Sequence, residues 1–310
     1  SEFSKLVLAV FLAWLLERRA GEEGSIRRTL VPALGVTGLL AALVAKEPDL
    51  GTAMMLGVIC LVMLYAAGAR LLHLGALVAM GGAGVVGAII VTPFRMRRMG
   101  AFLNPWADSQ GTGYQIVQSL IAVGSGGAHG VGFAEGRQKM FFLPFAHSDY
   151  IFAVVGEELG LVGALTVLAV FGLFLWRGVR ASRRAPDRFG MLLGLGIVAG
   201  IVAQALFNMS VVLSLLPSKG IPLPFISYGG SSMLLTLAGV GVLLNISQQG
   251  TDAYNAELLR LGSALAQRRG DAEKRGRGEK AKEGYGGAQP VSTSPRAPVP
   301  VSQTWRPEGR

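Results

Sequence analysis

The sequence predicts an all-α polytopic membrane protein, and three features point to that class. Of the 310 residues, 51% are hydrophobic and only 15% are charged, whereas soluble domains usually carry about 25% charged residues. The mean hydropathy of the whole chain is +0.47. The apolar residues are gathered into long runs instead of being spread along the chain, which is typical of helices that cross a lipid bilayer.

Seven apolar runs are the candidate transmembrane helices. In chain order they lie near 3–16, 30–45, 51–67, 71–92, 150–176, 190–217 and 228–247. Several are shorter than the ~20 residues that span a bilayer, so their exact ends are not defined by the pattern. The first run is short because the sequence begins within it, without an initiator methionine. We therefore expect the chain to be incomplete at its N-terminus.

Arginine and lysine are concentrated in alternate loops. The rich segments are 17–29, 68–70, 177–189 and the region after 251, and up to residue 189 they hold Arg18, Arg19, Arg27, Arg28, Arg70, Arg177, Arg180, Arg183, Arg184 and Arg188. The loops between them, 46–50 and 218–227, carry only Lys46 and Lys219. Because positively charged loops tend to stay in the cytoplasm, this alternation places the rich loops inside and the poor loops outside.

The long segment 93–149 departs from this pattern. It must lie outside by alternation, although it contains Arg95, Arg97, Arg98, Arg137 and Lys139. Long loops can be translocated despite their charge, so the orientation is retained. Either these cations are simply solvated, or they meet an anionic lipid headgroup. Within the segment, GYQIVQSLIAVGSGG predicts a helix too short to span, which would lie at the interface or re-enter the membrane.

The chain divides into two parts by composition. We predict a transmembrane domain at 1–250 and a disordered, basic cytoplasmic tail at 251–310, because the tail lacks an apolar pattern. The net charge of +10 fits cytoplasmic loops of a membrane protein, so no nucleic-acid partner is predicted; membrane lipids are. The single cysteine, Cys60, lies in an apolar run and is interpreted as a buried thiol.

Asp149 is the candidate catalytic residue. It follows His147 and Ser148 in the stretch LPFAHSDYIFAVVGEELG and directly precedes an apolar run. One interpretation is that Asp149 is the N-cap of the following helix. The other is that a carboxylate at the water–lipid boundary, beside a basic loop, accepts a proton from a lipid-borne substrate as a general base.

Two further acids, Glu157 and Glu158, lie two turns into the same apolar segment. Neighbouring residues on a helix point about 100° apart, so we do not expect both to face one partner. One of them is expected to pair with a cation or with a helix end.

Two other polar positions allow both a structural and a functional interpretation. Glu2 and Lys5 are three residues apart and share a helix face; a charged pair within a span either forms a structural salt bridge or lines a substrate cavity. Asp49, in the outer turn KEPDLGTA, either caps the next helix or contacts substrate.

The segment PLPFISYGGSS, at 222–232, is rich in proline, glycine and serine. Gly229 and Gly230 permit close backbone approach, and Ser231 or Ser232 can cap the last helix. The segment is either a packed re-entrant turn or a glycine-rich lining near a phosphate group.

These stretches together resemble the SEDS family of peptidoglycan glycosyltransferases, which includes FtsW and RodA. The matching residues run through SEFSK, KEPDLGTA, NPWADSQGTGYQIVQSLIAVGSGG, GRQKMFFLPFAHSDYIFAVVGEELG, NMSVVLSLLPSKGIPLPFISYGGSS and LLNIS, and cover nearly all of 1–248. GRQKMFFLP and SKGIPLPFISYGGSS resemble the FtsW branch more closely. The family's LPEAHTDF pattern is LPFAHSDY here, with Phe145, Ser148 and Tyr150 as replacements and Asp149 retained.

The resemblance implies the SEDS fold of ten transmembrane helices, of which this chain carries the last seven, with a large extracellular loop before the third-last helix. It implies a multi-pass protein of the bacterial cytoplasmic membrane that polymerises lipid II at the outer face, for septal wall synthesis in cell division. Asp149 would be the catalytic base. The expected substrate-binding residues are Glu2, Lys5, Asp49, Arg137, Lys139, His147, Ser148, Lys219, Ser227, Gly229, Gly230 and Ser231.

Partners and alternative functions follow from the same resemblance. The expected partners are a class B penicillin-binding transpeptidase and other divisome membrane proteins, and a divalent cation, Mg²⁺ or Mn²⁺, is a candidate cofactor without an identified ligand set. The alternatives are a lipid II flippase, a RodA-type elongation polymerase and a non-catalytic division scaffold. The carboxylates of Glu2, Asp49 and Asp149 gather in the predicted outer half, which favours an enzyme over a transporter with a path across the membrane.

Overall fold

The computed structural model describes residues 1–285 apart from Glu23 and Pro48. Each of the seven predicted apolar runs forms a helix in this part of the chain. They are α1 (Glu2–Arg18), α2 (Val31–Lys46), α3 (Leu50–Ala67), α4 (Leu71–Val91), α7 (Ile151–Arg183), α8 (Arg188–Val212) and α9 (Gly230–Tyr285). Six of them are long and apolar enough to cross a membrane, and α1 has 17 residues. The prediction of an all-α polytopic membrane protein is confirmed.

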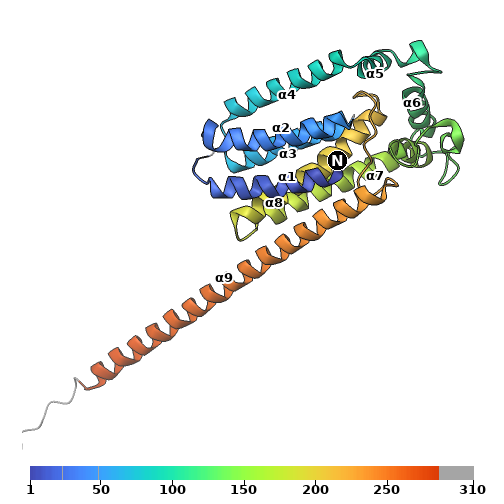
Figure 1. Ribbon diagram of the computed structural model, residues 1–310. Coiled ribbons are helices and arrows are strands. Elements are labelled where there is room, and N and C mark those ends of the chain that lie inside the picture. Colours follow the sequence, from blue (N-terminus) through green and yellow to red (C-terminus); the bar gives the residue numbers. More distant parts are fainter. Residues whose placement is uncertain (23, 48, 286–310) are drawn as a thin grey trace, which may run out of the picture. The chain divides into compact units, whose positions relative to one another are not determined.

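Helix α8 is the central helix of the bundle. It packs against α1, α3 and α7 and is the most buried of the six candidate spans. Helix α4 lies at the periphery, where it contacts α3 and α5 (Pro93–Leu103) (Figure 1). Its large apolar side chains, including Leu72, Val78 and Ile90, are exposed, as expected of a helix that faces lipid.

Local capping signals explain where α3 and α8 begin and end. The Asp49 carboxylate accepts a hydrogen bond from the Thr52 backbone N–H at 3.0 Å at the start of α3. Gly68, with φ of +100°, ends that helix in the left-handed conformation that glycine adopts most easily. Asp187 caps α8 by accepting from the Gly190 N–H at 3.1 Å. The capping interpretation of Asp49 is therefore confirmed.

The loops that were predicted to share a side of the membrane share an end of the bundle. At one end, Arg95 Nη2 donates to the Ala45 carbonyl oxygen at 3.2 Å and Arg98 Nη1 lies 3.4 Å from the Ser218 carbonyl oxygen. At the other end, Arg188 Nη2 donates to the Ala67 carbonyl oxygen at 3.0 Å. These contacts support the alternation that was read from the loop charges.

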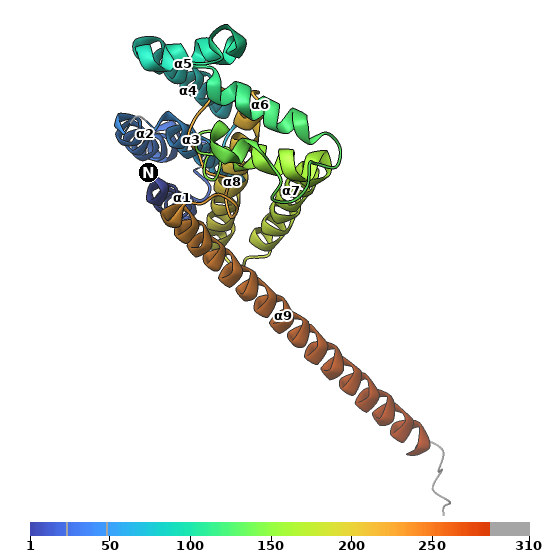
Figure 2. The same cartoon turned by 90° about the vertical axis from the view of Figure 1, so that its right-hand side faces the viewer.

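The long segment between α4 and α7 contains more helix than predicted. The expected short helix is confirmed as α6 (Tyr114–Gly126), and the structure adds α5 and a 3₁₀ turn at Pro105–Asp108. Both α5 and α6 lie at one end of the bundle, and α6 packs against α7 (Figures 1 and 2). Helix α5 was missed because its arginines give the sequence PFRMRRMG the appearance of a charged loop.

Helix α7 is interrupted at Gly160, where φ is +64° and ψ is −160°. Backbone groups around the break bond to residues 127–131: the Val131 N–H donates to the Glu157 carbonyl at 3.0 Å, and the Leu161 N–H donates to the Gly127 carbonyl at 2.9 Å. The loop after α6 thus satisfies backbone groups that the break leaves without helical partners.

The C-terminal part differs from the sequence prediction. Helix α9 continues through residue 285, whereas disorder was expected from 251 onward. The segment 251–285 is rich in Ala, Leu, Glu, Arg and Lys and contains no proline, so its helix propensity is high even without an apolar pattern. Residues up to Tyr254 belong to the compact helical unit and later ones to a second unit. Residues 286–310 of the predicted tail lie outside the described part.

Candidate active site

A cleft of about 410 Å³ lies at the end of the bundle where the loops before α3, around α5 and after α8 meet. One wall is apolar and comes from α3, α4 and α8, with Leu50, Met54, Val85, Val86, Ile89 and Phe207. The polar lining consists of Glu47, Asp49, Arg95, Arg98, Ser218 and Lys219. The structure therefore brings the predicted residues Asp49 and Lys219 together with Arg95 and Arg98, two of the loop cations that were considered as contacts of an anionic headgroup.

Carbonyl oxygens hold the two cleft arginines in place. Arg95 donates to the carbonyls of Ala45 and Ala88, both at 3.2 Å, which ties α5 to α2 and α4. Arg98 donates to Ser218 and lies over the Phe94 ring, with its guanidinium carbon 4.4 Å from the ring centroid. Because carbonyl contacts leave the guanidinium charges uncompensated, both side chains remain available to an anion in the cleft.

Lys219 is a third cation in the cleft. Burial lowers its pKa to about 8, with the charge of Arg95 adding to the effect, Asp49 opposing it and Arg98 reinforcing it. Its ammonium group lies 3.8 Å from the Met54 sulfur. A partly buried ammonium group beside two guanidinium groups creates a site that favours an anionic ligand.

Asp149 does not cap α7, because Tyr150 occupies the N-cap position and no side-chain cap is formed there. Its carboxylate instead packs against Gly220, where an added Cβ would lie 2.8 Å from Asp149 Oδ2. Burial raises the pKa of Asp149, while a hydrogen bond from Ser148 and the charges of His147 and Arg98 act in the opposite direction. The close approach at Gly220 places the carboxylate against the residue that follows Lys219.

Three successive backbone carbonyls hold the turn that carries Asp149. The His147 carbonyl accepts from the Tyr228 N–H at 2.9 Å, and the Ser148 carbonyl accepts from Ser227 Oγ at 2.5 Å. The Asp149 carbonyl accepts from Asn208 Nδ2 at 2.7 Å. Ser227, which was expected to contact substrate, is here engaged in joining the 222–232 segment to this turn.

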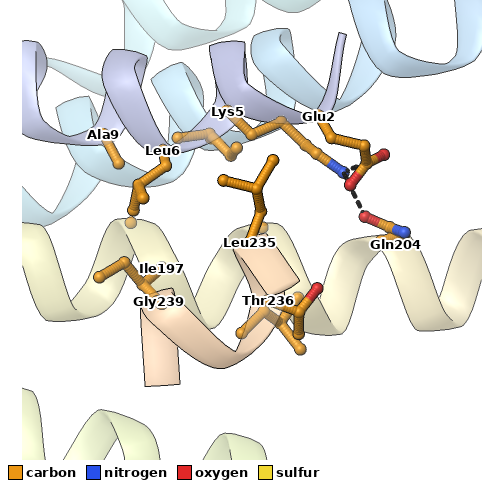
Figure 3. A pocket seen from close by; sticks show the side chains of 13 residues that line it. Glu2, Lys5, Leu6, Ala9, Ile197, Gln204, Leu235, Thr236 and Gly239 are labelled. Carbon is orange, nitrogen blue, oxygen red and sulfur yellow. Dashed lines mark hydrogen bonds and ion pairs between the residues drawn. The ribbon is translucent and has the colours of Figure 1, made fainter. Parts of the chain in front are cut away.

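The Glu2–Lys5 pair lies between α1, α8 and α9 in a second, smaller cavity (Figure 3). The two charged groups are 2.8 Å apart, Lys5 also donates to Gln204 Oε1, and Ser232 Oγ donates to Glu2 at 3.1 Å. Gln204 Nε2 in turn donates to the Pro222 carbonyl at 2.8 Å. The salt-bridge interpretation is confirmed, and the same pair also lines a cavity.

Arg137 and Lys139 do not line the cleft. Lys139 forms an ion pair with Glu158 Oε1 at 2.5 Å and donates to the Ala134 carbonyl at 2.7 Å. The Arg137 backbone N–H donates to Glu157 Oε1 at 2.9 Å, at the start of a short helical turn. The prediction that one of the two acids pairs with a cation or a helix end is confirmed, and both acids anchor the same loop.

The glycine–serine segment lies at the start of α9. Gly230 is the first residue of that helix, and a Cβ added at Gly230 would meet open space. Ser231 is exposed, whereas Ser232 reaches Glu2. Gly229, Gly230 and Ser231 do not line the cleft, so their expected contact with substrate stays a prediction.

Among residues 1–285 as described, no cluster of three or more His, Cys, Asp and Glu side chains could hold a metal ion. The positive charge that the described residues present to the cleft comes from Arg95, Arg98 and Lys219. A divalent cation acting here would therefore need ligands from an anionic substrate as well as from the protein.

Comparisons with known proteins agree with this architecture. Residues 1–252 match the family of FtsW, RodA and SpoVE, described as cell cycle proteins. Stage V sporulation protein E of Bacillus subtilis (strain 168) is 45% identical over 248 residues, which are 80% of this chain and 68% of that protein. The probable peptidoglycan glycosyltransferase FtsW of Geobacter metallireducens is 44% identical over 247 residues, 80% of this chain and 66% of that protein.

Solved structures give the same result. A peptidoglycan synthase complex, described as coordinating polymerization and crosslinking, matches with a TM-score of 0.63 and 30% identity, over 80% of this chain and 69% of that chain. The rod shape determining protein RodA of Thermus thermophilus matches with a TM-score of 0.54 and 26% identity, over 80% of this chain and 64% of that one. The chain thus spans about two thirds of the length of these relatives.

Proposed function

The chain belongs to the FtsW/RodA/SpoVE family, and we propose on this basis that it is a peptidoglycan glycosyltransferase that polymerises lipid II for septal wall synthesis. The observation that carries the proposal is the position of Asp149. Its partly buried carboxylate lies against Gly220 and within the electrostatic influence of Arg98, and both of these residues line the cleft.

The lining of the cleft fits an amphiphilic, anionic substrate. Lipid II carries a pyrophosphate between an isoprenoid chain and a disaccharide-pentapeptide. Arg95, Arg98 and Lys219 offer positive charge to the pyrophosphate, and the apolar side chains of α3 and α4 offer a surface to the first isoprene units. The outward face of α4 is exposed and apolar, so a chain leaving the cleft on that side would pass directly into lipid.

The proposed reaction is a single displacement at the anomeric carbon of the donor. The hydroxyl oxygen of the acceptor sugar attacks that carbon, Asp149 accepts the hydroxyl proton, and the bond from the anomeric carbon to the pyrophosphate oxygen breaks. The lipid pyrophosphate leaves with the bonding electrons, and the configuration is inverted. Burial raises the pKa of Asp149 and so strengthens it as a base, and the cleft cations stabilise the charge that develops on the leaving group.

The arrangement of charges favours this reaction over transport. A flippase needs polar groups along a path through the bundle, whereas Asp49, Arg95, Arg98, Asp149 and Lys219 gather at one end. The partly buried pair Glu2 and Lys5 is already joined in a salt bridge, and the buried acids Glu157 and Glu158 are engaged by the loop that carries Arg137 and Lys139. A pure scaffold would need neither the cleft nor a carboxylate beside it.

Septal rather than elongation synthesis is supported by the relatives. The FtsW of Geobacter metallireducens is 44% identical, whereas the RodA of Thermus thermophilus is 26% identical. The complex that coordinates polymerization and crosslinking supports a class B penicillin-binding transpeptidase as partner. The chain is a multi-pass membrane protein; that the cleft faces outside and the C-terminal region the cytoplasm is part of the proposal.

The decisive experiment is polymerisation by the purified full-length protein. Fluorescent lipid II is supplied in detergent, alone and with a co-purified transpeptidase, and products are separated on a gel. We expect a ladder of glycan strands that disappears when Asp149 is replaced by Asn. Absence of polymer under all conditions, combined with movement of labelled lipid II across vesicle membranes, would support the flippase instead.

A further inference from the structure

We propose that Asn208, on α8, is a positioning residue that holds Asp149 in its reactive place against Gly220. The inference rests on the proposed function, since it concerns the residue that serves there as the base. Asn208 touches neither the anomeric carbon nor the acceptor hydroxyl in this scheme, and acts through the backbone of the turn that carries Asp149.

The contacts of Asn208 carry the inference. Its side-chain nitrogen donates to the carbonyl oxygens of Asp149 and Ile221, both at 2.7 Å. Asp149 lies just before α7, and Ile221 directly follows Gly220. One amide group therefore fixes both sides of the contact between the Asp149 carboxylate and Gly220, and does so from the most buried of the candidate spans.

The two acceptors also dictate how the amide is oriented. Both neighbours are carbonyl oxygens, so only the NH₂ end of the side chain can satisfy them. Asn208 is 2% exposed, and among the described residues its Oδ1 is buried without a hydrogen-bond partner. A buried amide with an unsatisfied oxygen is unfavourable for packing alone, so the two donated bonds are what this position gains from asparagine.

The other bonds to the turn cannot replace Asn208. Ser227 and Tyr228 hold the carbonyls of Ser148 and His147, but they belong to the same segment as Ile221. Asn208 anchors that segment to α8 through the Ile221 carbonyl. Without it, the segment keeps the bond from Gln204 on α8 to the Pro222 carbonyl, but the turn loses its bond to α8 at the Asp149 carbonyl.

Loss of this attachment has a defined electrostatic consequence. The charged and titratable groups that act on the Asp149 carboxylate are His147 and Tyr150 on its own segment and Arg98 on α5. Burial is the largest influence on Asp149 and raises its pKa. A looser turn exposes the carboxylate to water, so its pKa falls toward the ordinary value. The base then stays ionised to lower pH, and the acidic limb of the rate profile moves to lower pH.

The experiment compares Asn208→Leu with Gln204→Leu. Gln204 lies one turn earlier on α8 and makes the equivalent bond to the neighbouring carbonyl, that of Pro222, while its oxygen accepts from Lys5 and not from the Asp149 turn. Both changes remove a buried amide of similar kind. The pH dependence of kcat and KM for lipid II polymerisation is measured for each variant and for the wild-type protein.

We expect Asn208→Leu to lower kcat roughly 10- to 100-fold, the effect of misplacing a reacting group by about 1 Å, with little change in KM and an acidic limb shifted to lower pH. Gln204→Leu leaves the acidic limb where it is, whatever it does to the melting temperature. Asn208→Gln, which keeps both donors on a longer arm, restores part of kcat. If Asn208→Leu does not accumulate in membranes, Asn208→Ser takes its place. A serine cannot donate to both carbonyls at once, and it adds no apolar bulk.

An unshifted acidic limb in a folded Asn208 variant, or an equal shift in Gln204→Leu, overturns the proposal. Failure of the proposed function is a separate outcome. It would be recognised by full polymerisation activity in Asp149→Asn. A protein that needs Asp149 but tolerates Asn208→Leu without a shift retains the function and loses only this inference.

Discussion

The Asp149 carboxylate does not cap a helix. The effect of replacing it on catalysis can therefore be measured separately from its effect on stability. Asp149→Asn keeps the size of the side chain and removes no helix cap, because Tyr150 is the N-cap of α7. We expect a protein that inserts into the membrane and melts close to the wild type. Polymerisation of lipid II should fall at least ~100-fold, the lower range for loss of a general base. Polymer at the wild-type rate would refute the assignment of the base.

Lys219 provides a test through the alkaline side of the pH profile. Its pKa is lowered to about 8 by burial, so the free protein loses this cleft cation as the pH rises through about 8. If Lys219 binds the pyrophosphate, kcat/KM falls over that range, and Lys219→Arg, which stays charged, extends activity to higher pH. Lys46→Arg, an exposed lysine that does not line the cleft, is the control and should keep the wild-type profile. If the fall of kcat/KM at alkaline pH persists unchanged in Lys219→Arg, another group is responsible for it.

The lowered pKa of Lys219 affects stability in the opposite direction from substrate binding as the pH rises. The unfolded Lys219 binds its proton more tightly than the folded one, so between about 8 and the ordinary lysine pKa the unfolded state carries more protons. The free energy of unfolding therefore rises with pH over that window. Substrate binding and stability thus respond to Lys219 in opposite directions, and measuring both distinguishes them.

The residues that sequence reasoning found and those it missed differ in where they lie. Asp49, Asp149 and Lys219 stand out as polar groups at the ends of apolar runs. Arg98 was considered only together with the other cations of segment 93–149 and was not singled out, because it lies among other arginines. Asn208 was not selected because it lies within an apolar run, where one amide is indistinguishable from a helix-packing residue until its two acceptors are known.

At the scale of elements, the break in α7 depends on two glycines from different segments. An added Cβ at Gly160 would lie 2.4 Å from the Gly130 nitrogen, and Gly160 has a positive φ. Gly160→Ala should therefore destabilise the protein by at least the ~1–3 kcal/mol of a strained backbone residue, measured by melting in detergent. Gly172→Ala, in the same helix with open space around it, should be neutral or stabilising by up to about 1 kcal/mol. Equal melting temperatures for the two variants would show that the break is not maintained in the folded protein.

The Glu2–Lys5 pair couples three elements and can be tested by exchanging its charges. Glu2→Lys with Lys5→Glu re-forms the bridge on α1, but the new carboxylate at position 5 faces Gln204 Oε1, the present acceptor of the Lys5 bond. Gln204 cannot turn its amide without losing the bond to the Pro222 carbonyl. We expect the exchange to recover part of the stability lost by either single change, and little of the polymerisation. Full recovery of both melting temperature and activity would show that the pair is only structural.

At the scale of the whole molecule, the sequence predicted the number and order of the long apolar helices better than their limits. Hydropathy is a property of each run and needs no tertiary information, so all seven runs are helices. The extension of α9 to residue 285 was missed because an absent apolar pattern says nothing about local helix propensity. The cleft was not predictable as a volume, since it is formed by three loops that are distant in the sequence and meet only when the bundle packs.

The orientation of the bundle in the membrane gives the last prediction. Loop charges place the segment between α4 and α7 outside and the α7–α8 connection inside, and the structure places their contacts at different ends of the bundle. Single cysteines at Gln110 and Arg183, both exposed, are introduced with Cys60→Ala, which removes the buried native thiol. In intact cells an impermeant maleimide should label the cysteine at Gln110 and not that at Arg183, and permeabilised cells should label both. Labelling of Arg183→Cys alone in intact cells would put the cleft on the cytoplasmic side. The substrate would then have to be polymerised before it crosses the membrane, and the proposed function would be lost together with the orientation.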